Sequence, residues 1–205
     1  LLDNAMIYPL GEHTGLVEWI ENSTTIRSEF ERWQKDKIAK LKKNGINVPS
    51  IIEKPEKHFI ASVVAKTKVK SRALWDTNSL LEAYCEMTAQ IPPSIVSQFL
   101  VRTASIPGDW MRNQQNYTDT LALTSAGGFF VGLGDRHLDN ILLSETTGKV
   151  SHIDFNVCFS KGDSLRVPER VPFRLTRNLE AALGPALCHG RYESAFTAAL
   201  SGMLT

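Results

Sequence analysis

The stretch that decides the fold is residues 131–159, VGLGDRHLDNILLSETTGKVSHIDFNVCF. Two apolar runs of the β type, residues 141–143 and 150–153, flank a polar turn that contains glycine. This pattern predicts a β-hairpin. Because the two ends of a hairpin lie side by side, we expect the amide of Asn140 to lie next to the carboxylate of Asp154.

Asn140 and Asp154 would place two oxygen ligands at one point. Such a pair suits a hard cation, Mg²⁺ or Mn²⁺, that also binds substrate phosphates. Asp135 stands five positions before Asn140, as in the protein-kinase catalytic loop, where the Asp accepts the substrate hydroxyl proton and the Asn binds metal. His137 is a polar group in the same loop that could lie against the γ-phosphate. The sequence therefore predicts phosphoryl transfer, with Asp135, His137, Asn140 and Asp154 as candidate catalytic residues.

Each of these polar residues also has a structural explanation. An Asp in a glycine-flanked turn commonly bonds its own backbone, and His137 alone could equally be structural. We expect Arg136 to tie the loop to the core and His152 to pack or to support Asp154. The joint spacing of the two acids, the Asn and the hairpin favours the catalytic interpretation.

The whole chain has the composition of an ordinary globular protein. Its 205 residues are 42% apolar and 22% charged, with 23 Lys and Arg against 22 Asp and Glu, which excludes a collagen, a disordered linker or a nucleic-acid tail. Three cysteines without a CxxC spacing favour reduced thiols in the cytosol or nucleus. No signal peptide is visible, and no apolar run reaches the length of about 18 residues that a membrane span needs.

The charge is unevenly distributed along the chain. Residues 27–43 hold seven bases and three acids, and residues 53–72 hold six and two. We expect a helix over 25–43 and then an irregular loop over 46–58, so that residues 35–72 form a basic loop or insertion. A solvated surface explains this charge, and so does a docking surface for an acidic partner.

The rest of the chain predicts mostly helices. Residues 5–10 and 16–20 have the pattern of a strand hairpin, and residues 22–25 supply N-caps for the helix that follows. Later helices are expected from residue 79, with a break at 91–94, and over 111–130.

Residues 132–140 and 152–156 resemble the phosphatidylinositol 3-kinase-related protein kinases, and the resemblance extends to residues 8–20 and 167–176. It implies an α+β, protein-kinase-like bilobal fold of the PI3K/PI4K type. No glycine-rich phosphate loop precedes residue 8, so most of the N-lobe is expected to lie outside this chain. The resemblance divides the chain into the end of the N-lobe and hinge (1–22) and the C-lobe (23–205), with a catalytic loop (131–140) and an activation loop (154–176).

The same resemblance implies an ATP site at the hinge. Backbone groups of Glu18 and Ile20 would bind the adenine, and the ring of Trp19 would lie against it, which suits two π faces. A Trp in an apolar strand is otherwise a core residue. Asn140 and Asp154 would hold the metal.

Within the family, residues 156–169 are most similar to the kinases of nonsense-mediated mRNA decay. This implies a Ser/Thr protein kinase acting on Ser-Gln or Thr-Gln sites of a protein such as an RNA helicase, with regulatory subunits of a decay complex, in the cytoplasm and also the nucleus. No direct binding of nucleic acid is expected. A pseudokinase scaffold and a phosphoinositide lipid kinase are the alternatives. The spread of basic residues over 161–177 disfavours the lipid kinase, whereas Asn156, where most relatives have Gly, leaves a weak enzyme open.

Overall fold

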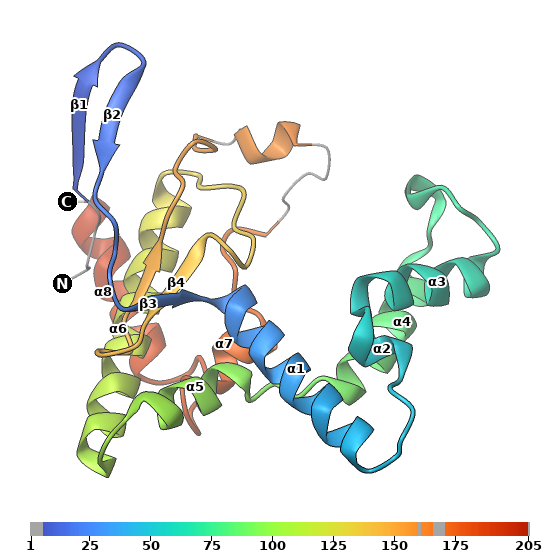
Figure 1. Ribbon diagram of the computed structural model, residues 1–205. Coiled ribbons are helices and arrows are strands. Elements are labelled where there is room, and N and C mark those ends of the chain that lie inside the picture. Colours follow the sequence, from blue (N-terminus) through green and yellow to red (C-terminus); the bar gives the residue numbers. More distant parts are fainter. Residues whose placement is uncertain (1–5, 160, 166–170, 205) are drawn as a thin grey trace. The chain divides into compact units, whose positions relative to one another are not determined.

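A computed structural model describes residues 6–159, 161–165 and 171–204 (Figure 1). The chain divides into two compact units, Leu1–Glu29 with Ser94–Thr205, and Phe30–Pro93. Most described residues are helical and a few form short strands, so the predicted mostly helical architecture is confirmed. No helix in the described part of the chain is both long and apolar enough to cross a bilayer.

The first unit begins with the predicted strand hairpin. Strand β1 (Ile7–Gly11) pairs antiparallel with β2 (Thr14–Val17), and both are exposed. Strand β2 ends at Val17 instead of reaching Ile20, which leaves residues 18–22 outside regular structure as the connection to the next strand.

A three-stranded sheet carries the predicted central hairpin. Strand β4 (Ile141–Ser144) pairs with β5 (Val150–His152), as expected, and β3 (Ser23–Thr25) adds a strand on the other edge of β4 (Figure 1). Strand β3 was not predicted, because its residues have the character of helix caps. The capping function is also present, since the Ser28 N–H donates to Thr25 Oγ1 at 3.0 Å.

The core of this unit lies between the sheet and its helices. Ile141, Leu143 and Val150 are fully buried against Tyr117 and Leu121 of the long helix, which also packs along the last helix. The Tyr117 hydroxyl donates to the Leu179 carbonyl at 2.9 Å. The helices and the short 3₁₀ turn of this unit are α5 (Ile95–Thr103), α6 (Pro107–Phe130), η2 (Lys161–Ser164), α7 (Arg177–Ala181) and α8 (Arg191–Leu204).

The second unit is helical throughout most of its length. Helix α1 (Ile26–Lys43) begins in the first unit and continues into this one. The rest consists of α2 (Ser50–Glu53), α3 (Pro55–Thr67), the 3₁₀ turn η1 (Arg72–Leu74) and α4 (Thr77–Gln90).

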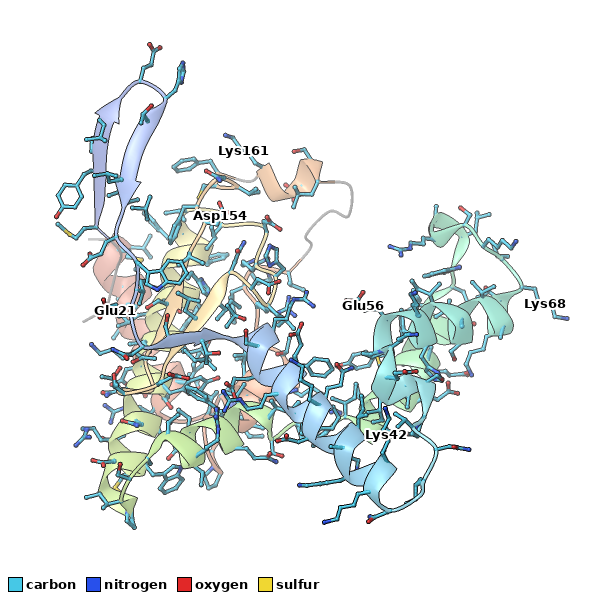
Figure 2. The ribbon with its side chains drawn as sticks, in the orientation of Figure 1. Glu21, Lys42, Glu56, Lys68, Asp154 and Lys161 are labelled. Carbon is cyan, nitrogen blue, oxygen red and sulfur yellow. The ribbon has the colours of Figure 1, made fainter. Side chains whose placement is uncertain are left out.

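The expected irregular loop over 46–58 is therefore wrong for most of its length. Pro55 occupies the first turn of α3, where its missing N–H costs nothing. Most of the basic segment 35–72 is helical as well, and Lys42 and Lys68 reach outward from it into solvent (Figure 2).

Candidate functional site

The predicted catalytic loop connects α6 to β4. Its glycine-rich start is bonded to the segment that follows Asp154: the Gly134 N–H donates to the Val157 carbonyl at 2.7 Å, and the Phe159 N–H donates to the Val131 carbonyl at 2.7 Å. The two predicted loops therefore begin side by side. Both loops place their acids in the left-handed region, with φ of +54° at Asp135 and +62° at Asp154, which Asp tolerates better than most residues.

Asn140 is fixed in orientation by this loop. Its side chain is buried, and Nδ2 donates to the Asp135 carbonyl at 2.9 Å. Because the amide nitrogen is used in this way, Oδ1 is the atom left to act as a ligand. The Ile153 N–H donates to the Asn140 carbonyl at 3.0 Å, so the next residue, Asp154, begins beside Asn140, as the hairpin predicted. Asp154, labelled in Figure 2, is exposed.

These two side chains fit a magnesium-type ion by the chemistry of their donors. An amide oxygen and an exposed carboxylate are hard ligands, and Mg²⁺ commonly takes one or two protein ligands and completes its shell with phosphates and water. Among the described residues no cluster of three or more His, Cys, Asp or Glu could hold a metal ion, so zinc-type coordination is not offered there.

Arg136 has a structural role, but its Nη2 bonds to Val171, which is exposed, and not to the core as expected. Arg136 is buried, and its Nη2 donates to the Val171 carbonyl at 2.8 Å, while Arg174 Nη1 donates back to the Arg136 carbonyl at 3.0 Å. This exchange ties the catalytic loop to the segment ahead of α7. Burial lowers the pKa of His152, and the nearby positive charge of Arg136 adds to this, giving a value of about 4, so this imidazole is neutral at pH 7.

The segment predicted to be the hinge lines a hollow of about 560 Å³. Trp19 is 85% exposed, so it is not a core residue, as a Trp in an apolar strand would otherwise be. The Glu18 N–H is already used, because it donates to the Met6 carbonyl at 2.8 Å, which leaves the Glu18 carbonyl free to meet a ligand. The residues lining the hollow are Glu18, Trp19, Ile20, Glu21, Ser23, Leu142, Ser144, Thr146, Thr147 and Ser151.

Leu142 is a site residue that the sequence reasoning missed. Strand alternation places it on the face of β4 opposite the buried Ile141 and Leu143, so it forms an apolar wall of the hollow. It lies two residues after Asn140, about 7 Å along the strand at the usual rise. The alternation of β4, together with the expected metal ligand before it, was the signal that could have identified this residue.

Comparison with known proteins agrees with this geometry. The model of the family "Phosphatidylinositol 3- and 4-kinase" matches residues 2–201. The serine/threonine-protein kinase SMG1 of Danio rerio is 36% identical over 191 residues, which are 87% of this chain and 5% of the relative. The serine/threonine-protein kinase smg-1 of Caenorhabditis briggsae is 37% identical over 206 residues, 95% of this chain and 9% of the relative.

Solved structures agree as well. The structure described as the FAT and kinase domain of CtTel1 has a TM-score of 0.73 and 26% identity, covering 96% of this chain and 13% of that chain. The chain spans only a small part of the length of each of these relatives. The resemblance predicted from residues 132–140 and 152–156 is confirmed, and the chain belongs to the phosphatidylinositol 3- and 4-kinase family.

Proposed function

We propose that this chain is the catalytic part of a Ser/Thr protein kinase, which transfers the γ-phosphate of ATP to a protein hydroxyl. The observation that carries the proposal is the bond from Asn140 Nδ2 to the Asp135 carbonyl. That bond joins the candidate base to a candidate metal ligand, and the hairpin places Asp154 beside the same point. Phosphoryl transfer depends mainly on such positioning and on charge neutralisation.

Each residue has a defined task in this reaction. The carboxylate of Asp135 accepts the proton of the substrate hydroxyl. At the same time the hydroxyl oxygen bonds to the γ-phosphorus, and the bond from that phosphorus to the departing ADP oxygen breaks. His137 donates a hydrogen bond to the transferring phosphate. Asn140 Oδ1 and Asp154 would hold Mg²⁺ or Mn²⁺, which would supply positive charge against the phosphates of ATP.

The hollow at the hinge suits the adenine of ATP. Leu142 offers an apolar surface, the exposed ring of Trp19 offers a π face, and the free carbonyl of Glu18 can accept from an amino group. Because Leu142 lies in β4 and Asn140 immediately precedes that strand, base and phosphates would lie along β4.

Membership of the family does not identify the substrate, for which we make a more specific proposal. The relatives named SMG1 are serine/threonine-protein kinases, and we propose that this protein likewise phosphorylates Ser or Thr followed by Gln. An RNA helicase of nonsense-mediated mRNA decay is the proposed substrate. Regulatory subunits of a decay complex are the proposed partners, in the cytoplasm and also the nucleus.

The test measures phosphate incorporation from radiolabelled ATP by the intact polypeptide. Asp135→Asn keeps the volume of the side chain and its tolerance of positive φ, but it removes the base, so we expect about a thousandfold loss of transfer. Asp36→Asn, in the exposed part of α1, is the matched control and should keep full activity. A Ser-Gln peptide should be labelled more strongly than a Ser-Ala peptide of otherwise identical sequence.

The alternatives give different results in the same assay. A pseudokinase scaffold would bind Mg-ATP and label neither peptide. A lipid kinase would label phosphoinositide vesicles in preference to the Ser-Gln peptide. Equal labelling by wild type and Asp135→Asn would refute the catalytic assignment.

A further inference from the structure

We propose that Arg27 and Asp139 are a pair of positioning residues that hold the catalytic loop, and His137 within it, for phosphoryl transfer. The inference rests on the kinase function proposed above. Neither residue belongs to the catalytic set predicted from the sequence, and both lie in the first compact unit.

Arg27 bonds to two consecutive residues of the catalytic loop. It is the second residue of α1, and its backbone N–H donates to the Leu138 carbonyl at 3.3 Å. Its side-chain Nε donates to Asp139 Oδ2 at 2.7 Å. The first N–H groups of a helix have no partner within the helix, so the loop satisfies one of them. The start of α1 and the catalytic loop are thereby fixed to each other.

Asp139 in turn orients His137. The Asp139 N–H donates to His137 Nδ1 at 3.2 Å, and the bond from Arg27 to the Asp139 side chain holds that N–H in place. An imidazole that accepts at Nδ1 carries its proton on Nε2 when it is neutral. The His137 side chain is about half exposed (47%), so Nε2–H is able to donate to a phosphate oxygen. Displacement of Asp139 would release the ring from this orientation.

The charge of the pair explains why Arg27 is needed. Asp139 immediately precedes Asn140, and an uncompensated carboxylate there would repel the phosphates of ATP. The guanidinium of Arg27 offsets that charge. The two side chains are 41% and 45% exposed, and an ion pair as exposed as this contributes little to stability. Its removal should therefore affect catalysis far more than folding.

The experiment compares four variants of the intact polypeptide with wild type. Arg27→Met and Asp139→Ala should each lower kcat about tenfold while KM for ATP changes less than about twofold. The kcat of the double variant should be no lower than that of the more impaired single variant, because the two changes remove the same interaction. Asp139→Asn should stay within about threefold of wild type, since its amide oxygen still accepts from Arg27 Nε.

Hydrogen exchange gives a readout besides activity. Amides of residues 131–143 should exchange faster in Arg27→Met and Asp139→Ala, with little change in the thermal midpoint. Arg112→Met is the matched control, because it breaks an ion pair of the same length, 2.7 Å to Asp109, at the start of α6; it should change neither kcat nor the exchange of 131–143.

Several outcomes would refute the proposed positioning role of Arg27 and Asp139. These are unchanged kcat in Arg27→Met, additive losses in the double variant, an Asp139→Asn variant as impaired as Asp139→Ala, or losses that simply follow a lowered thermal midpoint. A wild-type protein that labels no peptide would instead refute the proposed kinase function, so the two failures are distinguishable.

Discussion

Gly148, in the turn between β4 and β5, is a position where one added methyl group should disturb the site. Its φ is +70°, and a Cβ there would lie 2.6 Å from the backbone oxygen of Asn113 in α6 and 2.9 Å from the Asn113 Cβ. Gly45, in the loop after α1, has a nearly identical φ of +68° but nothing within 4 Å of the added atom. The two positions therefore share the backbone cost and differ in the clash.

The magnitude follows from these distances. Ala in the left-handed region costs about 1–2 kcal/mol, and the stiffer unfolded chain returns about 0.4–1 kcal/mol, so Gly45→Ala should lose no more than about 1.6 kcal/mol. Gly148→Ala must also separate two backbones, at a further cost of about 1–3 kcal/mol. We expect a total near 3 kcal/mol, which is roughly a hundredfold faster exchange of the β4–β5 amides.

The assay is hydrogen exchange on the intact polypeptide, read in peptides covering 141–152 and 40–50, with phosphoryl transfer measured in parallel. Because the hairpin carries Asn140 at one end and Asp154 at the other, Gly148→Ala should also lower kcat about tenfold, whereas Gly45→Ala should not. Protection of 141–152 within threefold of wild type would refute the reasoning, since it would mean that the turn and α6 can separate at almost no cost.

Further predictions concern three buried groups in the same unit. Tyr117→Phe removes the hydroxyl that donates to Leu179 at 2.9 Å and should cost about 1–2 kcal/mol, measured by exchange of α6 amides. Arg102→Met removes the cation 2.6 Å from Glu29, which is 4% exposed, and should cost about 2–3 kcal/mol by the same method. The pKa of His152 is lowered to about 4, so as pH falls the unfolded chain binds the proton of this residue before the folded chain does. The free energy of unfolding should therefore fall by up to about 1.4 kcal/mol per pH unit between pH 6.5 and pH 4. In His152→Gln the thermal midpoint should fall less over the same pH range.

The candidate metal pair could be predicted from sequence because its geometry is local. Asn140 and Asp154 flank the two strands of one hairpin, and strand pairing alone brings them together. The orientation of the Asn140 side chain could not be predicted, since it depends on a carbonyl five residues earlier in an irregular loop.

The features that were missed depend on contacts distant in sequence. Strand β3 is three polar residues long and gains its structure from β4, whose partner Ser144 is 121 positions after Ser23; no local period could indicate it. The error over 46–58 has a different cause. Two prolines there indicated a loop, but Pro55 starts a helix, and proline is compatible with both. Arg27 and Asp139 likewise meet across 112 positions.

Strand β3 has a consequence for how the length of this protein can vary among its relatives. Its register against β4 is fixed at Ser23 opposite Ser144, while four of the five residues before it, 18–21, line the hollow. One residue inserted into 18–22 would either slip β3 by a position or push the hinge away from Leu142. Residues 44–47, in contrast, are exposed and follow the end of a helix. Insertions and deletions should therefore accumulate in that loop and be excluded from 18–25, even where the amino acids themselves have diverged.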